Sequence, residues 1–186
     1  MAIKADVADP SAVEKMFESI ETAWDGIDIL VNNAGIDGGR AFGWESIIAA
    51  WKKVIEVNLL GAFYCSREAL RRMVPQKSGV ILTISSVHEE IAWSGYSAYT
   101  ASKAAVSMLT KTLAQEAAPH GVRVLAVAPG AIKTPQQFSL ERSRKAEGFA
   151  GENTAETHWR AGRSRSYGSG AGFGYCHLCD RPHGFR

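Results

Sequence analysis

Three short apolar segments, each followed by Asn, Ser, Pro or Gly, most constrain how this chain of 186 residues can fold. The segments are residues 27–31, 80–84 and 122–128. Apolar runs of this length, bounded by polar and glycine residues, are typical of strands buried in a parallel sheet. Helical spacing of apolar residues predicts helices before and between them. The expected helices span residues 10–24, 44–73 and 97–118. This alternation indicates an α/β fold with right-handed crossovers between strands.

The ends of these elements carry signals of their own. Asp9 and Pro10 predict a helix start, because Asp caps free N–H groups and Pro suits the first helical position. Pro75 is expected to break the second helix. Asn58 lies in the middle of that helix and is a poor helix former, so we expect two helical pieces that meet there. Residues 3–7 are expected to form the end of a further strand.

The composition of the chain changes after residue 135. Residues 1–135 contain 13 Lys and Arg against 14 Asp and Glu, whereas residues 136–186 contain 8 against 5. The second segment has neither Val nor Ile, so it cannot supply a buried parallel strand. We therefore expect an α/β domain over residues 1–135. We expect residues 136–186 to be a Gly- and Arg-rich tail that is disordered or translated out of frame.

Charge and hydropathy exclude several partners. No apolar run reaches the roughly 18–20 residues of a membrane span, and the first residues have no signal-peptide core, so we expect a cytoplasmic protein without a membrane partner. The net charge of +2 comes from the tail and is too weak to indicate nucleic-acid binding. Cys176 and Cys179, with His183, have the spacing of zinc ligands. We expect no metal site, since the chain has only one such Cys pair, and zinc binding by the tail is the alternative.

Tyr99 and Lys103 are the strongest candidates for chemistry. They lie four residues apart on an expected helix and therefore share one face. An ammonium group one turn away favours a phenolate, which makes Tyr a usable general acid or base. An exposed pair without chemistry is the alternative at this spacing. Ser86 ends a strand 13 residues before Tyr99, and its hydroxyl either holds the substrate oxygen or caps the loop backbone.

The carboxyl ends of the expected strands form the predicted binding edge, because ligands of parallel α/β sheets bind there. Residues 33–35 and 129–130 follow two of the strands. Asn32 and Asn33 also suit a turn, and Gly35 lets a cofactor approach the backbone closely. For Asn58, the functional interpretation is a local helix opening whose exposed carbonyl binds water. The alternative is an Asn that faces solvent or bonds back to its own helix.

Several of these motifs recur in an order and spacing typical of one family. They are Asn32-Asn33-Ala34-Gly35, Asn58, Ser86, Tyr99-Thr-Ala-Ser-Lys103 and Pro129-Gly-Ala-Ile-Lys-Thr134, preceded by Lys4-Ala-Asp-Val7. Over about residues 2–135 the chain resembles the short-chain dehydrogenase/reductase family. The resemblance implies a Rossmann-like, doubly wound parallel sheet and NAD or NADP as cofactor. Within the family, residues 85–93 and 129–135 look most like those of glucose 1-dehydrogenases.

The resemblance implies a role for each matched residue. Tyr99 would be the general acid/base, Lys103 would stabilise its phenolate and hold the nicotinamide ribose, and Ser86 would orient the reacting oxygen. Asn58 would anchor a proton-relay water. The cofactor-binding residues would be Asp6, Val7, Asn33, Ala34, Gly35, Tyr99, Lys103, Pro129, Gly130, Ile132 and Thr134. The implied reaction is hydride transfer between NAD or NADP and a CH–OH group of a sugar or alcohol, in a homo-oligomer that is a tetramer in the family.

Two departures from the family leave other functions open. The first two strands and the Gly-rich phosphate loop of the family have no counterpart in this sequence. The residue that distinguishes NAD from NADP in the family belongs to the same region and also has no counterpart. We therefore expect an N-terminally truncated, incomplete sheet in which residues 27–31 form an apolar edge. After Pro135 the family's substrate lid is not recognisable. The alternatives are an inactive paralogue that cannot bind cofactor, or an enzyme that acts on a different alcohol or ketone.

Overall fold

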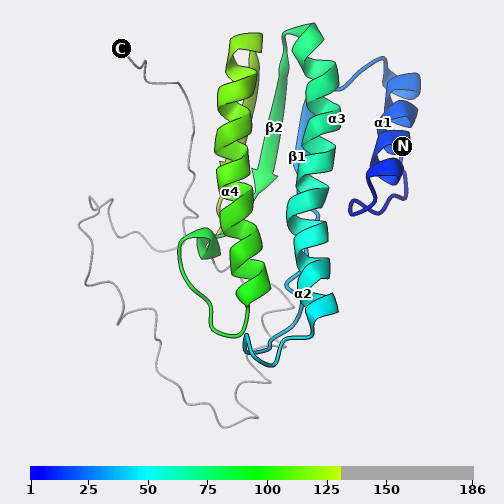
Figure 1. Ribbon diagram of the computed structural model, residues 1–186. Helices are drawn as coiled ribbons and strands as arrows, with labels where there is room; N and C mark the ends of the chain where they lie inside the picture. Colours follow the sequence, from blue (N-terminus) through cyan, green and yellow to red (C-terminus); the bar gives the residue numbers. More distant parts are fainter. Residues whose placement is uncertain (131–186) are drawn as a thin grey trace, which may run out of the picture. The chain divides into compact units, whose positions relative to one another are not determined.

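A computed structural model describes residues 1–130, in which helices and strands alternate (Figure 1). Ile132, Thr134 and the predicted tail lie outside the described residues. The elements are α1 (Pro10–Trp24), β1 (Ile29–Asn32), α2 (Ile48–Ile55), η1 (Glu56–Leu60), α3 (Gly61–Gln76), β2 (Gly79–Ile84), η2 (Val87–Glu89), α4 (Ser97–Ala117), η3 (Ala118–His120) and β3 (Val122–Val127). Here η1 is a π-helical turn, whereas η2 and η3 are 3-10 turns. None of the described helices is long and apolar enough to cross a membrane.

The three described strands form one parallel sheet in the order β1-β2-β3. Ile29 of β1 lies opposite Val80 of β2, and Gly79 of β2 lies opposite Val122 of β3. Figure 1 shows α3 and α4 lying along the sheet, with α1 beside α3. The predicted α/β fold with a Rossmann-like parallel sheet is therefore confirmed.

The core lies where α1, α3 and α4 pack against the sheet. Side chains alternate between the two faces of a strand, so Ile81, Val122 and Val124 are buried together. They join Phe17 of α1 and Met73 of α3 in one apolar cluster. Asp9 starts α1 as predicted, because its carboxylate accepts a hydrogen bond from the amide of Ser11 at 2.9 Å. This cluster holds α1, α3 and α4 against the sheet.

β1 is an edge strand within residues 1–130, because it pairs only with β2. Its side chains Ile29 and Val31 are 63% and 51% exposed. The apolar edge expected from the sequence is therefore present in the described residues. Unpaired backbone groups beside exposed β-branched side chains favour association with another strand.

Two sequence-based expectations about the elements are wrong. Residues 3–7 are not a strand, because extended chain becomes a strand only by pairing, and β1 and β3 pair only with β2 in the described part of the chain. Asp6 instead forms a turn, in which its carbonyl accepts a hydrogen bond from the Asp9 amide at 3.1 Å. Pro75 does not break α3, which continues to Gln76. Pro75 costs the helix one hydrogen bond, because it has no N–H group, but only Gln76 follows it in α3.

Cys65 lies in the core, and burial raises the pKa of its thiol from 9.0 to about 11. Between these values the folded chain keeps a proton that the unfolded chain has lost. The stabilisation from this thiol is therefore complete below pH 9 and is lost as the pH rises through 11. We expect the stability advantage of the parent chain over Cys65→Ala to shrink by roughly 2–3 kcal/mol across that window. Urea unfolding of both chains at several alkaline pH values measures it, and a constant difference would contradict the assignment.

Candidate active site

The carboxyl ends of the three strands lie along one edge of the sheet and present the predicted polar residues there. Residues 33–35 follow β1 and are exposed. The end of β2 is joined to β3 through the Ser85 amide, which donates to the Val127 carbonyl at 2.8 Å. The Val87 amide donates to the Pro129 carbonyl at 3.1 Å. The loops after β2 and β3 are thereby fixed side by side.

Lys103 is buried where α4 crosses the end of β2. Its Nζ donates to the Ile84 carbonyl at 2.7 Å, and its own carbonyl accepts from Ser85 Oγ at 3.3 Å. Both ends of Lys103 are therefore attached to β2. Burial lowers the pKa of Lys103 below its ordinary value, and the nearby charge of Glu89 acts in the opposite direction. One bond to a carbonyl leaves further ammonium protons to donate.

Tyr99 lies one turn before Lys103 and is half-buried. Lys103 Nζ lies 5.6 Å from the centre of the Tyr99 ring. The edge of the Tyr99 ring contacts Trp93, at a centroid distance of 6.1 Å. Trp93 in turn stacks between His88 at 4.5 Å and Tyr96 at 3.8 Å. These three residues form an aromatic wall beside Tyr99, which the sequence analysis missed although four aromatic rings within 12 residues of a loop and helix start signal it.

Asn58 occupies the π-helical turn η1, where two helical pieces meet as predicted. Its side chain is buried, and its Oδ1 accepts from the Ile36 amide at 2.8 Å. Its Nδ2 donates to the Ile36 carbonyl and to Ser102 Oγ, both at 2.9 Å. Both structural alternatives, a solvent-facing Asn and a back-bonded Asn, are therefore wrong. The side chain fixes the loop after β1, and the π turn is the local helix opening expected at this position.

Gly35 lies against both Asn58 and Lys103. A Cβ atom at Gly35 would come within 3.3 Å of Asn58 Oδ1 and 3.9 Å of Lys103 Nζ. The absence of a side chain lets the backbone of the exposed loop lie close to Asn58 and to the buried ammonium group. An exposed backbone beside a hydrogen-bond donor fits the ribose of a dinucleotide. The described residues are therefore compatible with the expected cofactor.

Asp6 and Val7 lie close to the start of α3. A Cβ atom at Gly61 would come within 2.8 Å of Val7 Cγ2 and 3.2 Å of the Val7 carbonyl oxygen. The carboxylate of Asp6 is exposed, accepts from the Ala8 amide at 2.9 Å and lies 3.5 Å from Lys53 Nζ. The bond from the Ala8 amide lowers the pKa of Asp6. Asp6 is therefore an exposed, ionised acceptor beside Lys53 of α2.

Ser86 is buried at the end of β2, and its Oγ accepts from the His88 amide at 3.2 Å. The structure thus contains the capping contact that the sequence analysis gave as the alternative role. Because the hydroxyl acts as acceptor in this bond, its own proton remains to be donated. The capping contact orients the side chain and is compatible with contact to a substrate oxygen.

Asn32 and Ser102 are two buried polar residues whose positions the sequence did not reveal. A turn was one alternative for Asn32, but it is the last residue of β1 and its Nδ2 donates to Ser66 Oγ at 2.9 Å. The same nitrogen lies 3.4 Å from Thr83 Oγ1, so Asn32 joins β1, α3 and β2. Ser102 has no exposed surface. The signal available in the sequence is a short polar residue within an otherwise apolar helix face.

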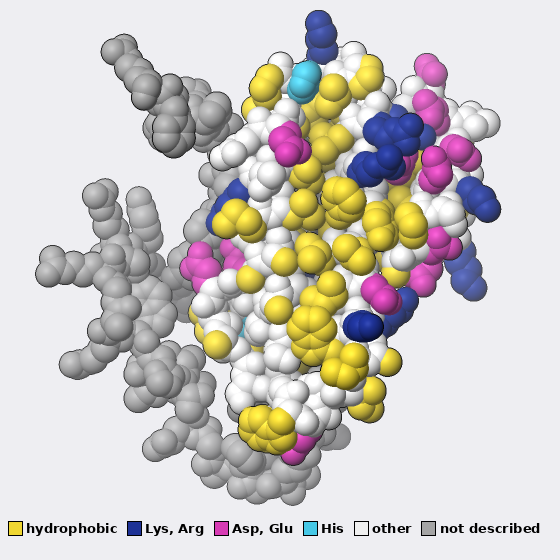
Figure 2. All heavy atoms as spheres, in the orientation of Figure 1, with side chains coloured by type: hydrophobic (Ala, Val, Ile, Leu, Met, Phe, Trp, Pro, Cys, Tyr) yellow, Lys and Arg dark blue, Asp and Glu magenta, His cyan; other side chains and the backbone are white. Residues whose placement is uncertain are grey.

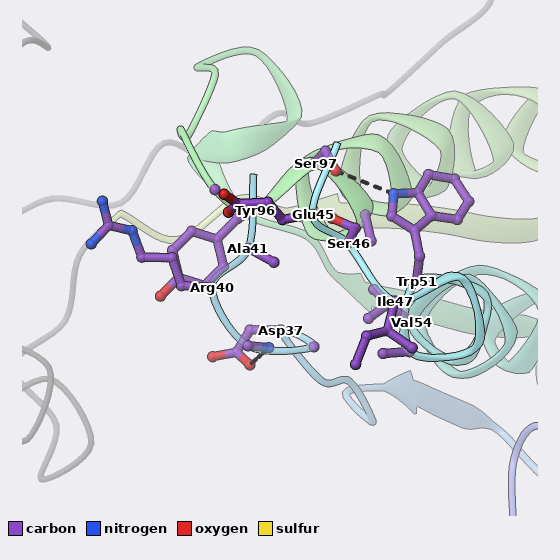
Figure 3. Close-up of a pocket in the computed structure, with 15 residues that line it drawn as sticks. Asp37, Arg40, Ala41, Glu45, Ser46, Ile47, Trp51, Val54, Tyr96 and Ser97 are labelled. Carbon is purple, nitrogen blue, oxygen red and sulfur yellow. Dashed lines mark hydrogen bonds between the residues drawn. The ribbon is translucent and has the colours of Figure 1, made fainter. Parts of the chain in front are cut away.

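A cavity of about 230 Å³ lies beside Tyr96, between the loop after β1, α2 and the start of α4 (Figure 3). Its labelled lining residues include Asp37, Arg40, Trp51, Val54 and Tyr96. Figure 3 shows the indole of Trp51 donating to Ser97 Oγ, at 3.2 Å, which ties α2 to the start of α4. Tyr99 and Lys103 do not line this cavity, so the proton-transfer candidates lie outside it.

A parallel sheet whose carboxyl edge carries a Tyr–Lys pair, a buried Asn and an exposed Gly-containing loop defines a Rossmann-like α/β protein. Residues 1–145 match the family model described as short chain dehydrogenase. The chain belongs to the short-chain dehydrogenase family. This match runs ten residues past the expected boundary at residue 135.

Relatives in the curated proteins and the solved structures agree with this family. The chain is 41% identical to 3beta-hydroxysteroid dehydrogenase 1 of Eggerthella lenta, over 91% of this chain and 69% of the relative. It is 33% identical to Glucose 1-dehydrogenase 2 of Bacillus subtilis, over 92% of this chain and 71% of the relative. The structure of ElxO with NADP bound matches with a TM-score of 0.71 at 33% identity, over 80% of this chain. NAD+-bound xylitol dehydrogenase matches with a TM-score of 0.72 at 29% identity, over 77% of this chain.

The chain spans only part of these relatives. It covers 58% of the ElxO chain and 55% of the xylitol dehydrogenase chain. Among the curated relatives, it covers as little as 53% of Cis-4-hydroxycyclohexanecarboxylate dehydrogenase of Sinomonas cyclohexanicum, to which it is 38% identical. The activity of the whole protein is therefore a matter for proposal.

Proposed function

We propose that this chain is part of an NAD- or NADP-dependent oxidoreductase that transfers a hydride between the cofactor and a CH–OH group. The observation that carries this proposal is the buried ammonium of Lys103, 5.6 Å from the centre of the Tyr99 ring and 3.9 Å from the position that a Cβ atom at Gly35 would take. The phenol of Tyr99 and the exposed backbone at Gly35 thus both lie near the Lys103 ammonium group. That combination suits proton transfer beside a bound dinucleotide.

In this proposal Tyr99 exchanges a proton with the substrate oxygen. Lys103 stabilises the phenolate form, because a buried cation interacts strongly with a nearby anion. Ser86 donates its hydroxyl proton to the substrate oxygen and so orients it. Asn58 fixes the loop after β1, and the carbonyl in its opened helical turn anchors a water that relays the proton to solvent.

The cofactor site we propose follows the carboxyl edge of the sheet. Asp6 and Val7 would contact the adenine, and residues 33–35 the adenosine ribose. Lys103 and Tyr99 would hold the nicotinamide ribose, and Pro129 with Gly130 would line the nicotinamide side. Ile132 and Thr134 belong to the same proposal but lie outside the described residues. When bound, NAD or NADP would accept or supply the hydride.

For the substrate we propose a sugar or alcohol, of which glucose is the first candidate. The motif over residues 85–93 and the 33% identity to Glucose 1-dehydrogenase 2 support this choice. The name of the relative from Eggerthella lenta instead refers to a hydroxysteroid, and that relative is 41% identical. A different alcohol or ketone is therefore the second candidate. The remaining alternative is an inactive chain that cannot bind cofactor.

We also propose a homo-oligomer, a tetramer, in the cytoplasm. Hydrophobic side chains gather over α3 and α4 on the face seen in Figure 2. Exposed apolar residues on η1, α3 and α4 include Leu60, Phe63 and Met108. Apolar helix faces of this kind suit helix-on-helix contact between copies of a chain. The buried free thiol of Cys65 suits a reducing compartment.

Cofactor binding tests the proposal directly. The Gly-rich phosphate loop of the family has no counterpart in this sequence, so binding by the purified, folded chain separates the proposal from the inactive alternative. The proposal requires that the fluorescence of NADH or NADPH saturates at micromolar concentration when it is titrated with this chain. Turnover of a panel that contains glucose, xylitol and a hydroxysteroid then ranks the substrate candidates. A folded chain that binds neither cofactor would overturn the proposal in favour of the inactive alternative.

Gly35→Val is expected to weaken cofactor binding by about tenfold or more. The added side chain would crowd Lys103 and press on Asn58, whose Oδ1 lies 3.3 Å from the Cβ position. Gly43→Val is the matched control, because a Cβ atom at Gly43 meets no other atom within 4 Å. Equal cofactor affinity in the two variants would contradict the placement of the cofactor at Gly35.

A further inference from the structure

We propose that Ser102 is a positioning residue that couples the loop after β1 to Tyr99 through Asn58; where it concerns turnover, this inference rests on the proposed function. Ser102 has no exposed surface, so its hydroxyl reaches neither solvent nor substrate. Its role must therefore act through the groups that it contacts inside the protein.

The contacts of Ser102 form a continuous chain of hydrogen bonds. Its Oγ donates to the Tyr99 carbonyl at 2.7 Å and accepts from Asn58 Nδ2 at 2.9 Å. Asn58 in turn holds both backbone groups of Ile36, at 2.8 and 2.9 Å. Ile36 directly follows Gly35 in the exposed loop. The chain therefore runs from the proposed cofactor loop to the backbone of the proposed acid/base residue.

The hydrogen-bonding capacity of each group fixes the direction of this chain. A hydroxyl has one proton, and Ser102 donates its proton to the Tyr99 carbonyl. Ser102 Oγ is therefore the acceptor in its hydrogen bond with Asn58. Asn58 Nδ2 has two N–H groups. One donates a hydrogen bond to the Ile36 carbonyl and the other to Ser102 Oγ. Without the Ser102 hydroxyl, the buried Asn58 keeps an amide proton that has lost its partner. The displaced side chain would loosen the loop at Ile36.

Thr110 provides a matched control on the same helix. It is also buried, and its Oγ1 donates to the Val106 carbonyl at 2.9 Å, but among the described residues this bond links α4 only to itself. Thr110→Val removes a buried hydroxyl with the shape kept. Ser102→Ala removes the hydroxyl that joins α4 to η1, and Ser102→Cys keeps most of the volume with a weaker hydrogen-bonding group. Ala is a strong helix former, so Ser102→Ala is expected to fold.

The experiment uses the full chain and two measurements, hydrogen exchange at the Ile36 amide and steady-state turnover. We expect Ser102→Ala and Ser102→Cys to speed exchange at Ile36 and to lower kcat, each by about tenfold, whereas Thr110→Val changes neither. In an Asn58→Ala background, Ser102→Ala should cost no further turnover, because its effect passes through Asn58.

Four outcomes are distinguishable. Unchanged exchange at Ile36 in Ser102→Ala overturns the coupling, and so does a further tenfold loss in the Asn58→Ala background. The same change in Thr110→Val also overturns it, because the effect would then be a general loosening of α4. If the folded parent chain shows no turnover, the proposed function fails, while exchange at Ile36 still decides the role of Ser102.

Discussion

Replacing Tyr99 with Phe is expected to lower turnover by about 10²- to 10⁴-fold, which is the usual contribution of a general acid or base. The substitution removes one oxygen atom and keeps the ring, so the edge contacts with His88 and Trp93 remain. Affinity for NADH or NADPH should fall only a few-fold, because the variant loses the contact of the Tyr99 hydroxyl with the nicotinamide ribose but keeps Gly35 and Lys103 on the cofactor side of the site. Steady-state kinetics and a fluorescence titration measure the two effects separately.

Tyr64→Phe is the control for this substitution. Tyr64 lies on α3 and packs against the core cluster, which contains neither Tyr99 nor Lys103, so its hydroxyl should not matter for turnover. Turnover of Tyr99→Phe within a few-fold of the parent would show that the phenol does not carry the proton. A loss of equal size in Tyr64→Phe would show that the effect is not local.

Lys103→Met is expected to lower turnover by about 10²-fold or more and to weaken cofactor binding. The variant keeps an apolar stem of similar length in the buried site but loses the ammonium group that lies 5.6 Å from the Tyr99 ring. It also leaves the Ile84 carbonyl without the 2.7 Å bond from Nζ. Lys111→Met, at an exposed position of the same helix, is the control and should retain full turnover.

The Lys103→Met variant also tests the electrostatics of the site. Because burial lowers the pKa of Lys103, the unfolded chain binds a proton that the folded chain has released, between the lowered value and the ordinary 10.5. The stability of the parent chain relative to Lys103→Met should therefore rise with pH as it approaches 10.5. A parent chain that loses stability relative to Lys103→Met over this range would contradict a Lys103 that is desolvated.

The sequence predicted the order and type of the elements, because these depend on local patterns. Helical spacing of apolar residues predicted α1 and α4, and the short apolar runs predicted the strands from β1 to β3. Asn58 marked the break between α2 and α3 because an Asn within a helix is locally unfavourable. The four-residue spacing placed Tyr99 and Lys103 on one helix face, where the structure has them.

Features that depend on contacts between distant segments could not be predicted. Residues 3–7 have strand-like composition, but pairing decides whether a strand forms. Asn32 is next to Asn33 in an apparent turn motif, yet its partners Ser66 and Thr83 lie 34 and 51 residues away. Ser102 was visible within a matched motif, and its partner Asn58 is 44 residues distant. Hydrogen bonds at such separations follow from the packing of α3 and α4 on the sheet.

The most direct test of the proposed site is the formation of reduced nicotinamide, followed by its near-ultraviolet absorbance. The parent chain and Tyr99→Phe would be given NAD+ or NADP+ with the panel of CH–OH substrates. We expect the parent chain to form reduced cofactor with at least one alcohol, and Tyr99→Phe to bind the cofactor but form reduced cofactor at least about 10²-fold more slowly. Equal rates in the two chains, or a folded parent chain that binds cofactor and reduces none, would contradict a Tyr99-centred dehydrogenase site.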